Sequence, residues 1–194
     1  MDIEYEATFL NVDKNDIREK LKDISATLIK PEYLQKRVVF NLPKDIDGVN
    51  RWLRVRDEGD KITMSLKDTD AGRIEDQKEI CLKVDNFENA VEFLELTGCQ
   101  KKAYQENKRE EWQCDECEIT IDEWPFLEPY VEIESTSEQA VKDMSKKMGF
   151  NYSKGLFCSA TTIYAKKYKI SPDVINNETP KIVFDMENPF LKTN

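Results

Sequence analysis

The sequence predicts an α+β domain in which antiparallel strands make up most of the framework. Runs of alternating polar and apolar residues recur up to residue 135, and a period of two is typical of strands with one buried face. Segments with an apolar residue at every third or fourth position, the spacing of one helix face, interrupt these runs. The chain has 194 residues, 39% of them hydrophobic, which is enough for one domain with its own core.

Eight runs show the alternation expected of a strand. In the first, for example, Glu4 and Glu6 flank Tyr5. The DEGDK segment at 57–61 predicts a tight hairpin turn between two of these runs. The predicted strands cover residues 4–9, 33–43, 51–56, 61–67, 73–84, 107–113, 118–122 and 129–135.

Helical spacing is found at residues 13–29, 86–98 and 137–149, and more weakly at 160–168. Residues whose side chains can accept hydrogen bonds from free backbone N–H groups precede the first three segments, and glycines follow two of them. The expected caps are Asp13 or Asn11, Asn86 and Ser137, and the expected ends are Gly98 and Gly149.

The domain is expected to cover residues 1–170. Residues 171–194 contain three prolines and two adjacent asparagines, which predicts a C-terminal tail. The apolar KIVF segment at 181–184 would pin this tail to the domain.

Charge and residue types exclude several classes of protein. The chain has 39 acidic and 29 basic residues, a net charge of −10, whereas nucleic-acid binding needs a basic face. It has no histidine, so Ser-His-Asp triads, Cys-His pairs and HExxH zinc sites are all excluded. It also lacks a GxxxxGK[ST] phosphate-binding loop. Any catalysis must therefore use carboxylates, Lys, Arg, Tyr, Cys or a metal held by oxygen atoms.

The N-terminal segment and the cysteines predict a cytoplasmic protein. The first ten residues lack the basic and apolar regions of a signal peptide, and no apolar run is long enough to cross a bilayer. The five cysteines are then expected to be reduced thiols. Cys114 and Cys117 form a CxxC pair between two predicted strands. We interpret them as thiols flanking a hairpin turn, with a redox or shared metal role as the alternative.

The polar faces of the strands carry pairs of like charges. Glu4 and Glu6 lie on one face of their strand, as do Arg54 and Arg56 on theirs, whereas solvated surfaces usually mix the two signs. If about eight strands close into a barrel, acidic and basic side chains meet across its lumen. The alternative is an open antiparallel sheet with its charged face in water. The spacing alone does not choose between them.

A lumen with both charge signs suits a metal–polyphosphate complex. Carboxylates without His or Cys favour hard cations such as Mg²⁺ or Mn²⁺. Arg and Lys bind phosphate oxygens, Arg through its planar fork and Lys as a point charge. The metal would neutralise part of the phosphate charge during attack at phosphorus.

Five motifs on the predicted strands resemble those of one family. They are an ExE at Glu4 and Glu6, WLRVR at 52–56 followed by SLK ending at Lys67, QKE at 77–79, REEW at 109–112 and IDEWPFLEPYVEIE at 121–134. With these motifs the chain resembles the CYTH superfamily, or triphosphate tunnel metalloenzymes, from about Asp2 to Tyr168. The resemblance implies an eight-stranded antiparallel β-barrel that forms an open tunnel, with helices packed on its outside.

The resemblance also implies the site residues. The metal-binding carboxylates would be Glu4, Glu6 and Glu134, with Asp122 and Glu132 beside them. The clamp for the triphosphate would be Arg54, Arg56, Lys67 and Arg109, with Arg37 and Lys154 as weaker matches. The implied cofactor is Mg²⁺ or Mn²⁺.

One position departs from the family signature ExExK, because Thr8 occupies the place of its lysine. The family's lysine contributes to phosphate binding, so we expect weak turnover or a shifted substrate. Alternatively, Lys36, Arg37 or Lys78 supplies the missing charge.

Three functions remain open on the sequence. The first is metal-dependent hydrolysis of inorganic, thiamine or nucleoside triphosphate, and the second is class IV adenylyl cyclase chemistry that releases pyrophosphate. The third is binding of a polyphosphate or nucleotide without turnover. In each case the partner is a small-molecule triphosphate or nucleotide, without nucleic acid or membrane, and a homodimer is left open.

Overall fold

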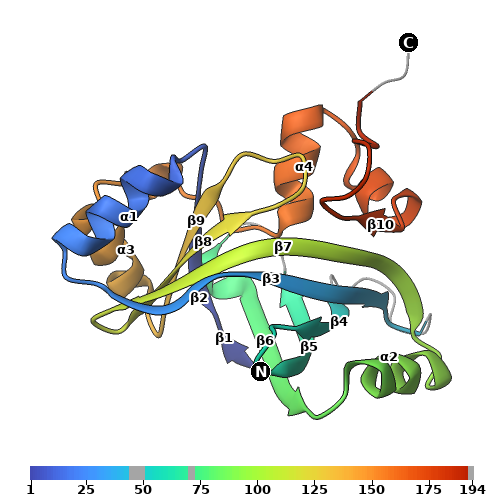
Figure 1. Ribbon diagram of the computed structural model, residues 1–194. Coiled ribbons are helices and arrows are strands. Elements are labelled where there is room, and N and C mark those ends of the chain that lie inside the picture. Colours follow the sequence, from blue (N-terminus) through green and yellow to red (C-terminus); the bar gives the residue numbers. More distant parts are fainter. Residues whose placement is uncertain (44–50, 70–72, 192–194) are drawn as a thin grey trace.

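The computed structural model describes residues 1–43, 51–69 and 73–191 (Figure 1). Nine strands follow one another in a single hydrogen-bonded path, in the order β1-β6-β5-β4-β3-β7-β8-β9-β2, and every pairing along it is antiparallel. The strands are β1 Asp2–Ile3, β2 Tyr5–Leu10, β3 Thr27–Asn41, β4 Arg51–Asp57, β5 Ile62–Thr69, β6 Gln77–Val84, β7 Gln100–Cys114, β8 Cys117–Glu123 and β9 Tyr130–Ser135.

The sheet closes on itself through the N-terminal strand. The two ends of the path, β1 and β2, are separated in the chain only by Glu4, so they act as one interrupted strand between β6 and β9. The Glu4 backbone N–H donates to the Gln77 carbonyl at 2.9 Å, and Gln77 Nε2 donates to the Glu6 carbonyl at 3.1 Å. Counted in this way, the path has eight strands, which confirms the predicted antiparallel barrel.

The first helix, α1 (Lys14–Asp23), ends earlier than predicted. Ser25 adopts a left-handed backbone with φ of 60°, and its N–H donates to the Lys22 carbonyl while that of Ala26 donates to the Leu21 carbonyl. These bonds end the helix, and β3 begins at Thr27 in register with Gln113 of β7. The predicted helix over 13–29 was therefore wrong beyond residue 23, because Thr27, Leu28 and Ile29 belong to β3.

The helices cover the outer face of the barrel. α1 and α3 (Glu138–Lys147) lie together over β2, β8 and β9, and α2 (Phe87–Leu96) lies over β3 and β4 (Figure 1). Asp13, Asn86 and Ser137 accept backbone hydrogen bonds as the predicted caps. Ala7, Ile119 and similar apolar residues of the strands are buried under these helices. The alternate, charged residues of the same strands must therefore point into the barrel.

The C-terminal segment packs against the barrel, and the KIVF segment at 181–184 contributes the buried residues Ile182 and Val183. The C-terminal segment comprises α4 (Ala160–Tyr168), the short η3 (Val174–Glu178) and β10 (Lys181–Ile182), which pairs in parallel with β7 (Figure 1). Its buried residues include Tyr164, Ile175, Ile182 and Phe190, which form one cluster with Trp124. Two further short helices are η1 (Ile74–Asp76) and η2 (Tyr152–Lys154).

Cys114 and Cys117 face each other across the two-residue turn between β7 and β8. Both are free thiols, and both are buried among the residues under α1 and α3. The prediction of hairpin-flanking thiols is confirmed. No helix in the described ranges is both long enough and apolar enough to span a membrane.

Candidate functional site

A cavity of about 590 Å³ lies inside the barrel and is lined mainly by charged and polar side chains. Nine of the eleven predicted site residues line it. These nine are Glu4, Glu6, Glu132, Glu134, Arg37, Arg54, Arg56, Lys67 and Arg109. The structure therefore places around one cavity most of the residues that the family motifs and the strand parity had predicted.

Two predicted residues lie outside the lining. Asp122 is completely buried behind Arg109, whose Nε and Nη2 donate to it at 3.0 and 2.8 Å. Asn107 Nδ2 donates to the same carboxylate at 2.7 Å. Asp122 therefore fixes the position of Arg109 instead of facing the cavity. Lys154 is exposed on η2 and does not line the cavity.

One wall of the cavity is acidic. Glu6, Glu134 and Glu118 lie side by side on β2, β9 and β8, because Glu134 is in register with both of the others. Among the described residues, none of the three has an ion-pair partner. Burial, together with the charges of Glu134 and Glu4, raises the pKa of Glu6 to about 7, and burial also raises the pKa of Glu118. Like charges at opposed positions repel, so this wall favours a cation or protons.

The opposite wall is basic. Arg37 on β3 is in register with Arg56 on β4, and Arg54 precedes Arg56 by two residues on the same face. Arg37 is buried, and within the described part of the chain its acceptors are both neutral, Gln35 Oε1 at 2.9 Å and Asn107 Oδ1. Burial and the charges of Arg54, Arg56 and Arg109 lower its pKa well below the usual value.

Two buried donor atoms on this wall lack an acceptor among the described residues. The Nε atoms of Arg37 and Arg54 make no hydrogen bond to any described residue. A buried donor without an acceptor costs about 1–3 kcal/mol, and more when the group is charged. Such donors on a cavity wall fit the oxygen atoms of an anionic ligand.

Lys67 joins the two walls. Its Nζ lies 2.7 Å from Glu4 and 3.1 Å from Glu79, and Arg54 Nη2 donates to Glu79 at 3.1 Å. Burial and a hydrogen bond to Glu79 raise the pKa of Glu4 to about 7, and the pKa of Glu79 is lowered by that hydrogen bond and by both cations. Proximity of the two carboxyl groups therefore favours the protonated form of Glu4 and the ionised form of Glu79.

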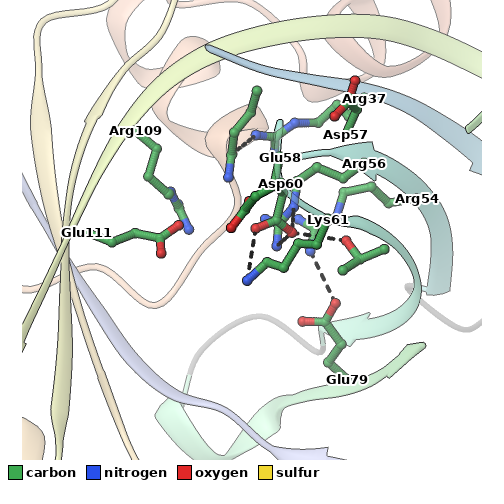
Figure 2. A network of polar contacts seen from close by, with 12 residues as sticks. Arg37, Arg54, Arg56, Asp57, Glu58, Asp60, Lys61, Glu79, Arg109 and Glu111 are labelled. Atoms are coloured by element: carbon green, nitrogen blue, oxygen red, sulfur yellow. Dashed lines mark hydrogen bonds and ion pairs between the residues drawn. The ribbon is translucent and has the colours of Figure 1, made fainter. Parts of the chain in front are cut away.

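Sequence reasoning did not select Glu79 or Glu118 as site residues. Both had the signal that selected the others, since Glu79 lies opposite Lys67 and Glu118 opposite Glu134 across paired strands. Sequence reasoning also missed Glu58, which belongs to the predicted DEGDK turn at 57–61. Glu58 is buried and accepts from Arg56 Nε at 2.9 Å and Thr63 Oγ1 at 3.1 Å (Figure 2).

The turn that carries Glu58 helps to hold the basic wall in place. Lys61 lies 3.3 Å from Glu58, and Lys30 Nζ donates to the Glu58 carbonyl at 2.6 Å. Figure 2 shows Arg54 and Arg56 on one side of the network and Arg109 across from them. The Glu58 carboxylate, which does not itself line the cavity, thus orients the Arg56 guanidinium.

The acidic wall has the donor chemistry of a hard-cation site. Its ligand atoms are all carboxylate oxygens, as Mg²⁺ and Mn²⁺ prefer. Within the ranges that the structure describes, no three Asp, Glu or Cys side chains already converge on one point. Glu6, Glu118 and Glu134 fit such a cation because they are neighbours and none of them forms an ion pair with a basic residue of the described ranges. Glu132 fits less well, since Arg109 Nη2 lies 2.6 Å from it.

Comparison with known proteins gives the family. The model of the CYTH domain matches residues 2–163. The chain belongs to the CYTH family.

Individual relatives agree with this assignment. A Methanocaldococcus jannaschii protein named "Putative adenylate cyclase" is 27% identical over 159 residues, which cover 80% of this chain and 90% of the relative. A Vibrio parahaemolyticus structure described as "a putative adenylate cyclase" has a TM-score of 0.71 at 13% identity, covering 84% of this chain and 98% of its own. A Hippeastrum structure has a TM-score of 0.55 at 16% identity and covers 88% of this chain and 97% of its own. The two structures share the fold.

The raised carboxyl pKa values predict how stability depends on pH. Glu6 has a pKa of about 7 and Glu132 of about 8, so the folded chain binds more protons than the unfolded chain between about pH 5 and pH 8. The free energy of unfolding should therefore fall as pH rises through this range. Urea denaturation in EDTA should show this fall, and Glu6→Gln should reduce it, with a gain on the order of 1 kcal/mol at pH 8.

Glu92→Gln is the matched control, because Glu92 is exposed on α2 and lies outside the cavity. It should leave the pH dependence unchanged. A stability that rises from pH 5 to pH 8, or an equal slope in Glu6→Gln and the wild type, would contradict the electrostatic description of the acidic wall.

Proposed function

We propose that this protein is a divalent-metal-dependent phosphohydrolase that cleaves the terminal phosphate from a triphosphate held in the barrel. One observation carries the proposal. Across one cavity, an acidic wall faces a basic wall, and in the described residues the first has three carboxylates without ion-pair partners and the second has two buried donors without acceptors. A metal–triphosphate complex is complementary to both walls at once, because the metal fits the first and the phosphate oxygens fit the second.

Each wall has a distinct role in this proposal. Glu6, Glu118 and Glu134 would hold Mg²⁺ or Mn²⁺, with Glu4 and Glu132 nearby. The bound metal would neutralise phosphate charge and orient the phosphate for attack by water. Arg37, Arg54 and Arg56 bind phosphate oxygens, and Arg109, held by Asp122, stabilises negative charge that develops in the transition state. Enclosure within the barrel strengthens these interactions by excluding bulk water.

Adenylyl cyclase activity is the second candidate, since the Methanocaldococcus jannaschii relative has that name. The Hippeastrum structure is described as a "putative adenylyl cyclase" with a dominant triphosphatase activity, which favours hydrolysis as the first candidate on this fold. Binding without turnover is the third.

Product analysis tests the proposal. With Mn²⁺ and either ATP or tripolyphosphate, we expect release of inorganic phosphate. Glu134→Gln should lower the rate at least about 100-fold, because it removes a charge from the metal site, while Glu92→Gln should not. Cyclic AMP and pyrophosphate as the main products would establish the cyclase instead. Tight binding with neither product would establish a binding protein.

The structure shows how Thr8, which stands in place of the signature lysine, and the candidate replacement cations lie relative to the cavity. Thr8 is buried, its Oγ1 has no partner among the described residues, and it does not line the cavity. Lys36 and Lys78 are exposed and do not line it either. Arg37 does line it and has no carboxylate partner in the described ranges. We infer that Arg37 supplies the charge that the signature lysine provides in its relatives.

Two substitutions test this inference. Arg37→Gln should weaken tripolyphosphate binding about 10- to 100-fold, the usual effect of losing a charge-assisted contact, and Lys36→Gln on the exposed side of the same strand should not. Thr8→Lys should give less than about a twofold gain. Isothermal titration calorimetry at low salt measures all three. A tenfold gain in Thr8→Lys together with a harmless Arg37→Gln would contradict the inference.

A further inference from the structure

The cavity has a third region beyond its two charged walls. Trp124, which follows β8, lines it together with side chains of α4 and the segment after it. We call this region the Trp124 subsite and define it by Trp124, Thr161, Tyr164, Ile175 and Asn176. The family match ends at residue 163, so three of these residues lie beyond it.

Hydrogen bonds and an aromatic contact within the protein hold the side chains of the subsite in place. Tyr164 donates its hydroxyl to the Pro125 carbonyl at 2.6 Å and contacts the Trp124 ring edge-on, with ring centroids 6.4 Å apart. Thr161 Oγ1 donates to Asn176 Oδ1 at 3.1 Å, which ties α4 to η3. Ile175 is 1% exposed. These contacts fix the C-terminal segment as one wall of the cavity.

The subsite offers a hydrogen-bond donor that the protein does not use. Trp124 is 5% exposed, and its Nε1 makes no hydrogen bond to a described residue. Arg37 lies over its ring at 4.5 Å, so the subsite adjoins the basic wall. Buried Trp N–H groups usually find an acceptor, and a ligand in this cavity can provide one.

The charges near the subsite select against a cationic ligand. The cavity-lining carboxylates all come from Glu4 or from β2, β6, β8 and β9, and none from α4, the segment after it or the adjoining part of β7. The basic residue that lies against the subsite is Arg37, over the Trp124 ring, and Lys102 of β7 lines the same cavity. A neutral group with acceptor atoms fits such surroundings, and a cationic ring does not.

We propose that the Trp124 subsite binds the neutral, hydrogen-bond-accepting base of a nucleoside triphosphate, which makes nucleotides better ligands than tripolyphosphate or thiamine triphosphate. This inference rests on the proposed function, since the phosphates must lie on the basic wall beside Trp124. The indole N–H donates to an acceptor atom of the base, and the C-terminal segment excludes water from that contact.

Calorimetric titration in Mg²⁺ buffer with three ligands tests the proposal. The ligands are adenosine 5′-(β,γ-imido)triphosphate, tripolyphosphate and thiamine triphosphate. The adenosine analogue should bind about five- to tenfold more tightly than tripolyphosphate, the gain expected from one or two buried hydrogen bonds, and thiamine triphosphate should bind more weakly than the analogue. Trp124→Phe keeps an aromatic ring without the donor, so it should remove this gain and leave tripolyphosphate binding unchanged.

Two further variants keep the test decisive. Asn176→Ala alters the subsite without removing a large buried side chain, and it should lower analogue affinity selectively even if Trp124→Phe does not fold. Tyr168→Phe removes a hydroxyl from the same aromatic cluster outside the cavity lining, and it should change neither affinity. Equal binding of analogue and tripolyphosphate, equal losses for both ligands, or tighter binding of thiamine triphosphate would overturn the subsite alone. If none of the three ligands binds, the proposed function itself fails.

Discussion

The interior of the barrel depends on one electrostatic constraint, the enclosure of many charged side chains in a small space. Strand geometry forces this arrangement, because the apolar residues of β2, β8 and β9 are buried under α1 and α3 and the alternate residues must point inward. Burying a charge is costly unless it is paired or solvated. The protein pairs some of its interior charges and leaves others facing the cavity.

The paired charges hold the site in shape. Asp122 binds Arg109, Glu58 binds Arg56, and Lys67 lies between Glu4 and Glu79. The cavity-lining charges left without such partners in the described chain are Glu6, Glu118 and Glu134 on one side and Arg37 and Lys102 on the other. They differ in sign and lie on different walls, and this separation distinguishes a binding site from an interior stabilised by its own ion pairs.

The sequence predicted the barrel and most of its lining because both follow from the alternation of residues. Glu4 and Arg54 could be selected from strand parity and the family motifs alone. Where the prediction failed, the cause was local backbone geometry or long-range packing. The left-handed conformation of Ser25 ends α1, and no motif announces it. Asp122 has the same parity as the lining residues, yet Arg109 covers it.

The C-terminal segment shows the limit of sequence reasoning most clearly. Its residues have no strong periodicity, so the sequence predicted a tail pinned to the domain by the KIVF segment alone. In the structure Ile175 and Ile182 are buried against the barrel, and Asn176 reaches the cavity. Contacts between residues 50 or more positions apart, such as those of β10 with β7, decide this packing. Apart from the apolar KIVF segment, the residue pattern within the segment does not contain that information.

The most direct test of the two-wall description is a crystal structure with Mn²⁺ and tripolyphosphate, using the anomalous signal of manganese. We expect manganese bound by oxygen atoms of Glu6, Glu118 and Glu134, with phosphate oxygens within hydrogen-bond distance of Arg37, Arg54 and Arg56. Manganese bound elsewhere, or tripolyphosphate outside the barrel, would contradict the two-wall description.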